Sequence, residues 1–554
     1  MKHFFTLFLL FLAASLSAQD TPHTVGLLSY NPNKAFDGYN LIYPHNQPNV
    51  YLLNNCGEIV HVWEDDPQWR PGNTAYLLDN GNLVKTKRLA AVTNDPIWAG
   101  GGGAIVEIRD WDNNLLWSFE LNNEQQRLHH DIALTDEGTI LMIVWELKTE
   151  EEAIQAGRNP ALLPDGEFWP DYVLEVDPAT DEIVWEWHVW DHLIQDFDPT
   201  KDNYGVVADH PGRVDINWDT SDGDADWMHT NAIDFHVDNN QVILSVPTFN
   251  EVWIIDHSTT TEQAAGSFGG FGGRGGELLY RWGNPAAYKS GATEDQTLFY
   301  QHDIHWVDNF LDFSNPYFNK LAVFNNRVGE DYSTANIFDP GFDMYKWQYP
   351  MSGQVWGPTG FDLTIQHPEP TMMYSTGLSS FQVLPNGNFL ICVGRFGYAF
   401  EITPENEIVW EYKVPLNGGA RVTQGNILGM NDNLTFRMDR YPADYSAFDG
   451  RSLSRQGWIE LEPDSAFCEQ ILPVGEQFTS YGLKVYPNPT TQQLVLEWEG
   501  GIWADFEVFD LWGRQVTRFR ATGGRKYMDI SGWREGVYFV RVNGMDVRKV
   551  TVVR

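Results

Sequence analysis

Apolar residues along this chain alternate with polar ones in short runs, and the runs come in pairs joined by a turn. In one kind of pair the turn holds Asn, Asp or Gly, which accept the positive φ of a tight hairpin turn. Such pairs occur at 73–86, 130–144, 231–246, 302–326 and 379–393. A second kind ends in or beside tryptophan and occurs at 50–64, 105–120, 173–188 and 400–414. Each of these segments predicts an antiparallel β-hairpin.

Two successive hairpins make a four-stranded sheet, and about six such sheets fit between residues 25 and 465. The periodicity of amphipathic helices is scarce. Four-stranded sheets repeated along a chain are typical of a β-propeller, whose radial packing buries both faces of each blade. We therefore predict an all-β protein with a six-bladed β-propeller at 25–465, in which the recurrent tryptophans pack between neighbouring blades.

Both ends of the chain depart from this pattern. Residues 483–554 hold several short strands with the turn spacing of a small β-sandwich, and they are more basic than the rest. We predict a C-terminal β-sandwich at 483–554, after a linker at 466–482. Residues 1–18 combine one lysine, an apolar stretch and small residues at the end, which predicts a secretory signal peptide.

Composition excludes several classes of function. The formal net charge of −40 repels a phosphate backbone, so no nucleic-acid partner is expected. Apart from the leader, no stretch approaches 18 uninterrupted apolar residues, so no integral membrane segment is predicted. The three cysteines, Cys56, Cys392 and Cys468, match no zinc-site spacing and allow at most one disulfide, whose pairing stays open. The carboxylates of 219–227 lack the EF-hand spacing and favour a solvated loop over a calcium site. We predict neither a metal site nor a cofactor.

Histidines open three of the predicted strands, at His130, His229 and His302. The innermost strands of a propeller converge on a central channel, so these imidazoles are predicted to gather around one axis. Arg327 follows the strand that pairs with the one after His302, and it can reach the same place. Imidazole and guanidinium groups suit a tetrahedral oxyanion, because both donate hydrogen bonds and imidazole also exchanges protons or acts as a nucleophile. For His129, strand alternation predicts a side chain that faces away from the axis. A purely structural role remains the alternative for each histidine.

With these residues in place, region 25–465 resembles the bacterial aryl-sulfate sulfotransferases. The resemblance rests on the segments 35–63, 129–146, 226–235, 281–285, 300–307 and 323–327. It implies a six-bladed propeller that moves a sulfuryl group from a phenolic sulfate to another phenol. It also implies that no nucleotide donor is needed and that the route passes through a sulfated histidine.

Three residues match the family motifs directly. His229 lies in the "D-W-x-H" segment, His302 follows glutamine in the "Q-H" segment, and Arg327 is the arginine that comes next. The resemblance implies that they bind the sulfuryl oxygens and assist proton transfer. Prearranged donors of this kind stabilise the charge that develops on sulfuryl transfer. His130, Asn326 and Arg395 are predicted to bind substrate.

The chain departs from the family where the nucleophilic histidine is expected. The corresponding segment, 374–402, contains no histidine. Tyr398 falls nearest the family position, with Arg395 close by. Tyr398 is therefore a candidate catalytic residue, as a covalent nucleophile if a base or cation lowers its pKa of about 10. It can equally bind a phenol or be inert, so the nucleophile stays unassigned.

The C-terminal region resembles the sorting domain of the type IX secretion system. The motifs are VYPNPT (485–490), VFDLWGRQV (508–516), GVYFVRV (536–542) and RKVTVVR (548–554). The resemblance implies passage through the periplasm, export by the type IX machinery, and removal of this module. The mature protein is then secreted or held at the cell surface. An accessory β-sandwich is the alternative.

The sequence thus favours an aryl sulfotransferase that takes an aryl sulfate donor and a phenolic acceptor at the propeller axis. The main alternative is a non-catalytic secreted propeller that binds sulfated or phenolic ligands or a partner protein. A quinoprotein dehydrogenase is also a Trp-rich secreted propeller. The lack of regular Trp-docking repeats and of a vicinal cysteine pair disfavours it.

Overall fold

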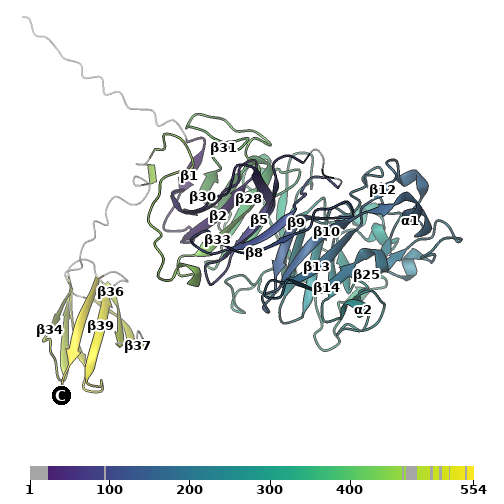
Figure 1. Cartoon of the computed structure of the whole chain (residues 1–554). Coiled ribbons are helices and arrows are strands. Elements are labelled where there is room, and N and C mark those ends of the chain that lie inside the picture. Colours follow the sequence, from purple (N-terminus) through teal and green to yellow (C-terminus); the bar gives the residue numbers. More distant parts are fainter. Residues whose placement is uncertain are drawn as a thin grey trace, which may run out of the picture. The chain divides into compact units, whose positions relative to one another are not determined.

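The computed structural model describes residues 23–92, 95, 97–464, 467–468, 483–498, 503–510, 514–522, 524–542 and 546–554. The predicted signal peptide, 1–18, lies outside the described residues, and so does most of the predicted linker at 466–482. The chain divides into two compact units, Met1–Cys468 and Glu469–Arg554. Both are built from β-strands, which confirms the all-β prediction (Figure 1).

Within the described part of the first unit, six antiparallel sheets of four or five strands make up the fold. Given from the innermost strand outward, they are β33 (Thr435–Pro442), β2 (Gly38–Pro44), β3 (Val50–Asn54) and β4 (Ile59–Trp63); β5 (Trp69–Leu77), β6 (Leu83–Leu89), β7 (Ile105–Arg109) and β8 (Leu115–Glu120); β9 (Gln126–Leu134), β10 (Ile140–Glu146), β13 (Asp171–Asp177) and β14 (Glu182–His188); β17 (Ala232–His236), β18 (Gln241–Val246), β19 (Glu251–Asp256) and β20 (Tyr280–Trp282); β21 (His302–Trp306), β22 (Leu321–Asn325), β23 (Thr334–Phe338) and β26 (Leu363–Ile365); and β27 (Ser380–Val383), β28 (Phe389–Val393), β29 (Tyr398–Ile402), β30 (Ile408–Lys413) and β1 (Gly26–Tyr30).

Every hairpin predicted from the sequence is present as a pair of adjacent antiparallel strands. The pairs β19–β20 and β23–β26 were not predicted, because long loops separate their strands in sequence. Short two-stranded pairs and helices fill the loops: β11 (Lys148–Thr149) with β12 (Glu167–Phe168), β15 (Leu193–Ile194) with β16 (Val214–Asp215), β24 (Met351–Ser352) with β25 (Val355–Trp356), β31 (Leu416–Asn417) with β32 (Ala420–Arg421), α1 (Glu150–Gln155) and α2 (Thr261–Ala264).

The innermost strands contact one another in a cyclic order. β5 contacts β9, β9 contacts β17, β17 contacts β21, β21 contacts β27, β27 contacts β33, and β33 contacts β5. β33, from the end of the unit, pairs with β2 from its beginning, and β1 pairs with β30. Strand pairing therefore joins the two ends of the unit.

Tryptophans of the outer strands connect neighbouring sheets. The Nε1–H of Trp63 in β4 donates to the backbone oxygen of Asp110, 3.1 Å away, in the turn after β7. Trp117 in β8 donates to the Asp181 carboxylate at 2.6 Å, and Trp410 in β30 to the backbone oxygen of Asn55 at 2.8 Å. The indole thus supplies both apolar area and a polar contact to the next sheet.

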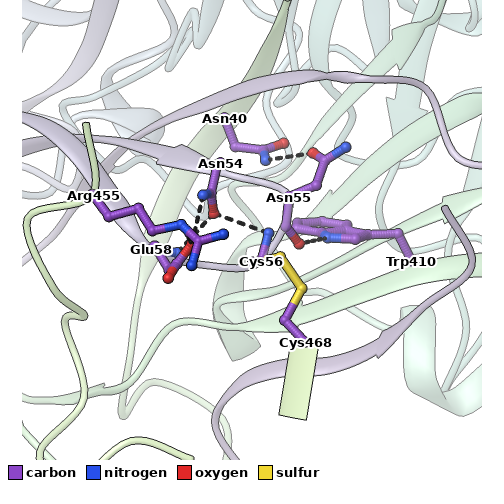
Figure 2. Close-up of a disulfide and its surroundings, with 8 residues drawn as sticks. All are labelled: Asn40, Asn54, Asn55, Cys56, Glu58, Trp410, Arg455 and Cys468. Atoms are coloured by element: carbon purple, nitrogen blue, oxygen red, sulfur yellow. Dashed lines mark hydrogen bonds and ion pairs between the residues drawn. A yellow bond between two sulfur atoms is a disulfide. The ribbon is translucent and has the colours of Figure 1, made fainter. Parts of the chain in front are cut away.

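A disulfide joins Cys56 to Cys468 across 412 residues of sequence, and Cys392 is a buried free thiol. Figure 2 shows the bond beside the turn between β3 and β4. The backbone N–H of Cys56 donates to Asn54 Oδ1, and Asn54 Nδ2 donates to Glu58. The pairing that the sequence left open is therefore the one that links the beginning of the unit to its end.

Replacing both Cys56 and Cys468 with serine should lower the free energy of unfolding by about 2–4 kcal/mol, because the bond restricts a long loop in the unfolded chain. Thermal unfolding followed by circular dichroism measures the loss. A reductant should lower the Tm of the wild type toward that of the double variant and leave the variant unchanged. Equal Tm values for wild type and variant would contradict this role.

The described residues of the second unit form two sheets: β34 (Lys484–Tyr486), β35 (Gln493–Glu497) and β38 (Arg525–Asp529), and β37 (Gln515–Thr522), β36 (Trp503–Asp510), β39 (Gly536–Val542) and β40 (Asp546–Val552). Leu494 and Leu496 of the first sheet share one buried apolar core with Phe506 and Val540 of the second. In the part of the chain that the structure describes, no helix is long and apolar enough to cross a membrane.

Candidate functional site

Two of the predicted histidines, from neighbouring sheets, lie against each other. His130 is in β9, and His229 lies just before β17; their ring centroids are 4.5 Å apart. Both residues have a φ of 52°, in the left-handed region that non-glycine residues rarely adopt. Strained backbone of this kind clusters at functional sites, because only a firmly packed surrounding structure maintains it.

His129 contacts this cluster as well, and the expectation that its side chain faces away from the axis stays a prediction. The pairing of β9 with β10 shifts register between Met142 and Val144, which marks a bulge beside His130. A bulge breaks strict strand alternation. As a result, His129 Nδ1 lies 2.9 Å from His130 Nδ1, and its ring stacks on Trp145 at 4.0 Å.

His302 begins β21 and is 3% exposed. Its Nδ1 lies 2.9 Å from Oδ1 of Asn326. The Asn326 amide donates from Nδ2 to the backbone oxygens of Ser375 and Leu378, which fixes Oδ1 as the atom facing the ring. Nδ1 of His302 therefore carries the proton and donates a hydrogen bond to Asn326 Oδ1. Burial is the main cause that lowers the pKa of His302 to about 3, so the ring is neutral at neutral pH.

Two aromatic residues join His302 to the other pair. The ring centroid of Tyr300 is 6.1 Å from that of His229 and 6.1 Å from that of His302. Phe436, in β33, lies 6.3 Å from both His130 and His302. The three predicted histidines, carried by three different sheets, thus surround one centre.

His229 is paired with a carboxylate. Its Nδ1 lies 2.5 Å from Oδ2 of Asp226, whose Oδ1 accepts a hydrogen bond from Trp145 Nε1 at 2.8 Å. Burial alone would lower the pKa of His229, but the charge and hydrogen bond of Asp226, helped by Asp171 and Asp224, raise it above its ordinary value. The pKa of His229 is therefore raised and that of His302 lowered, although the two share one centre.

A cavity of about 540 Å³ opens beside His229. Asp224, Asp226, Tyr300 and Arg327 are among the residues that line it. The Arg327 guanidinium lies 3.6 Å from the centroid of the Tyr300 ring, and its Nε donates to the backbone oxygen of Thr376 at 2.9 Å. The volume suits a small ligand, and the lining offers an aromatic face with one cation and two carboxylates.

Arg395 lies in the short turn Gly394–Phe396 between β28 and β29. Its positive charge is one of the causes that lower the pKa of His302, so the guanidinium lies within electrostatic reach of the cluster. Burial, and then the charge of Arg327, lower the pKa of Arg395 itself. The structure thus places two arginines from different sheets near the histidines.

The structure places Tyr398 elsewhere. It is 2% exposed and packs into the apolar core formed by the sheets of β21–β26 and β27–β30. Its hydroxyl donates to Glu411 Oε1 at 2.6 Å, and His367 Nε2 is 3.4 Å away. Burial and then the Glu411 charge raise its pKa well above the usual range, which disfavours the phenolate that a nucleophile needs.

Several members of the site were not predicted from the sequence. Asp226 stands three residues before His229, and this spacing could have identified it as a partner. Tyr300 precedes His302 by two residues and lies in the left-handed region, at a φ of 55°. His45 follows β2, and its charge is one of the causes that lower the pKa of His130. No motif in the sequence distinguishes His45.

The inner strands also carry a second cluster of polar residues, centred on Arg437. Arg437 of β33 lies 3.0 Å from Asp131 of β9 and 2.7 Å from Asp303 of β21, and it also donates to the hydroxyl of Tyr76 in β5. Tyr76 donates in turn to Asp131 at 2.6 Å. Burial is the main cause that raises the pKa of Asp303 and of Asp439 to about 7. One guanidinium therefore ties four inner strands together.

The acidic loop at 219–227 is engaged in protein contacts. Asp219 pairs with Arg158 and accepts hydrogen bonds from the backbone N–H groups of Ser221 and Gly223. Within the described ranges, no group of three or more His, Cys, Asp or Glu residues is arranged to hold a metal ion.

The solved structures that resemble this chain are distant from it. A protein of unknown function from Bacteroides caccae is 11% identical, with a TM-score of 0.35 over 68% of this chain and 94% of that one. A catalytically inactive variant of virginiamycin B lyase from Staphylococcus aureus is 11% identical, with a TM-score of 0.30 over 67% and 84%. PorZ, a surface component of the type IX secretion system of Porphyromonas gingivalis, is 9% identical, with a TM-score of 0.29 over 92% and 68%. These likenesses carry no argument about function.

Sequence comparison is more informative at the level of families. No curated protein matches the chain significantly. Residues 484–553 match the secretion system C-terminal sorting domain, which indicates export to the cell surface or secretion. Residues 31–346 match the arylsulfotransferase (ASST) family model, which covers more than half of the sequence. The chain therefore belongs to the arylsulfotransferase family.

Proposed function

We propose that the protein is a nucleotide-independent aryl sulfotransferase, and that its six sheets are the blades of a six-bladed β-propeller at 25–465. The cyclic order of contacts among the inner strands supports this architecture. The observation that carries the function is the convergence of His130, His229 and His302 beside a cavity that Arg327 lines. An aryl sulfate donates the sulfuryl group, and a phenol accepts it.

The roles follow from protonation and position. His229, held by Asp226 with a raised pKa, protonates the leaving phenolate and later takes the proton of the acceptor phenol. Arg327 stabilises the charge that develops on the sulfuryl oxygens and on the leaving phenolate. His130 contributes a further polar group at the centre, and Asn326 holds the ring of His302 in place.

Export fits this assignment. We propose that residues 1–18 direct the chain to the periplasm, and that the type IX machinery recognises the module at 483–554 and exports the protein. The sorting-domain match supports this route. The donor and acceptor phenols are then molecules that the protein meets outside the cytoplasm.

A direct assay tests the activity. The full chain is incubated with 4-nitrophenyl sulfate and a phenol in the absence of any nucleotide. We expect acceptor-dependent release of 4-nitrophenolate, together with the sulfated acceptor detected by mass spectrometry. Failure of the wild type to sulfate any of a panel of phenols would contradict the proposal.

The second candidate is a non-catalytic propeller that binds a sulfated or phenolic ligand, or a partner protein. The position of Tyr398 favours it, because the residue nearest the family nucleophile is engaged with Glu411 in the core. This alternative predicts a higher Tm in the presence of 4-nitrophenyl sulfate with no turnover.

A further inference from the structure

One edge of the Arg395 guanidinium faces Gly377, next to the ring of His302. Nη1 donates to Asn431 Oδ1 at 3.1 Å, and the backbone oxygen of Arg395 accepts from Asn431 N–H at 2.7 Å. Nε is buried, and within the described part of the chain it has no hydrogen-bond partner. Buried N–H donors are nearly always paired, so this donor is available to an oxygen of a ligand. The Nε and Nη2 groups of arginine bind two oxygens of an oxyanion at once.

Gly377 keeps the space in front of this edge open. A methyl group at Gly377 would lie 3.3 Å from Nη2 and 3.6 Å from Nε of Arg395. It would also lie 3.6 Å from Cε1 of His302. A side chain at Gly377 would therefore stand against both the guanidinium edge and the imidazole.

The neighbouring imidazole offers a nitrogen lone pair. Nδ1 of His302 donates to Asn326, and the backbone oxygen of Tyr300 is a second acceptor 3.3 Å away. Because Nδ1 holds the proton, the lone pair of the neutral ring is on Nε2. Burial keeps the ring neutral, as the lowered pKa shows. Because its ring is neutral and has a lone pair on Nε2, His302 fits the role of nucleophile best among the histidines of the cluster.

We propose that Arg395 and Gly377 form the sulfuryl subsite, and that Nε2 of His302 is the atom that accepts the sulfuryl group. The inference deepens the proposed aryl sulfotransferase function and rests on it. It supplies a nucleophile that does not depend on Tyr398 or on a histidine within 374–402.

The sulfuryl group is transferred in two steps, first to His302 and then to the acceptor. The lone pair of His302 Nε2 attacks sulfur; an N–S bond forms, the S–O(aryl) bond breaks, and the leaving phenolate takes a proton from His229. The sulfated ring carries a positive charge, and its Nδ1–H donates a hydrogen bond to Asn326 Oδ1, which stabilises that charge. The acceptor phenol then gives its proton to His229, and its oxygen attacks sulfur. The N–S bond breaks and returns its electron pair to His302.

Trapping the covalent intermediate tests the nucleophile. The full chain is incubated with 4-nitrophenyl sulfate without acceptor and quenched at alkaline pH, because N-sulfated imidazole is labile in acid. Intact mass should increase by one SO₃ group, and peptide mapping should place the group on His302. His302→Gln should abolish the label. His305→Gln, a matched change on the same strand, should keep it.

The outcomes separate this inference from the proposed function. A label on another residue, or sulfated acceptor formed with no label on any residue, would overturn the role of His302 and leave the sulfotransferase standing. A wild type that neither transfers nor becomes labelled would overturn both.

Binding of inorganic sulfate tests the subsite without turnover. Tm is measured in sodium sulfate and in sodium chloride of matched ionic strength, and the excess shift in sulfate is compared among variants, because sulfate stabilises proteins generally. Arg395→Gln and Gly377→Ala should lose the excess shift, whereas the exposed control Arg274→Gln should retain it. An equal shift in Arg395→Gln and the wild type would refute the subsite.

Discussion

Replacing His229 with glutamine should lower kcat for sulfuryl transfer from phenyl sulfate by about 10²- to 10⁴-fold, the usual contribution of a positioned general acid–base group. Glutamine keeps a polar group beside Asp226, but it can neither protonate the leaving phenolate nor accept the proton of the acceptor phenol. The loss should be smaller with 4-nitrophenyl sulfate, because 4-nitrophenolate leaves without a proton. Steady-state kinetics with both donors measures this difference.

Asp226, whose carboxylate is hydrogen-bonded to His229, gives an independent test of the role of His229. In Asp226→Asn, the largest cause that raises the pKa of His229 is removed, and burial then lowers it. The limb of the pH profile of kcat that reports His229 should therefore move to lower pH. Equal losses with both donors in His229→Gln, together with an unmoved pH profile in Asp226→Asn, would assign both residues a structural role only.

Replacing Arg437 with methionine should lower the free energy of unfolding by about 3–5 kcal/mol, the usual cost of removing one partner from a buried ionic group. Arg437 pairs with Asp131 and Asp303, and its charge also acts on Asp439. Without it, these three buried carboxylates lose the guanidinium that they share. Denaturant unfolding measures the loss, and Arg274→Met, at an exposed position, should change stability by less than about 0.5 kcal/mol.

The loss should depend on pH. The pKa values of Asp303 and Asp439 are raised to about 7 in the folded chain, against about 4 for an unfolded aspartate. Between these values the folded state holds more protons than the unfolded state, so stability falls as pH rises. Removing Arg437 should raise both pKa values further and steepen this fall, so that the variant approaches the wild type at acid pH. A loss independent of pH would show that the guanidinium acts through packing alone.

The sequence was sufficient for the hairpins because each one carries its own local signal. Alternating apolar residues around an Asn, Asp or Gly turn predicted strand pairs such as β9–β10 and β27–β28. The strands β20 and β26 were missed, since each is short and follows a long loop. The pairing of Cys56 with Cys468 was also out of reach, because it depends on the cyclic arrangement of the whole unit.

The site was predictable only in part, because some of its contacts depend on strand geometry that the sequence pattern does not reveal. His130, His229 and His302 lie in or just before the innermost strands of three neighbouring sheets, so their meeting followed from the architecture. The contact of His129 with His130 did not follow, because it depends on the bulge in β9. Tyr398 was placed by its nearness in sequence to the family nucleophile, whereas strand geometry turns it into the core.

The pairing of β33 with β2 has a consequence for export. The first sheet lacks its innermost strand until the chain up to Pro442 is available, so the N-terminal strands cannot reach their final state while later ones are still being delivered. Contacts between residues so distant in sequence also form slowly. A chain that crosses a membrane from its N-terminus therefore lacks a complete first sheet until almost the whole of the first unit has crossed.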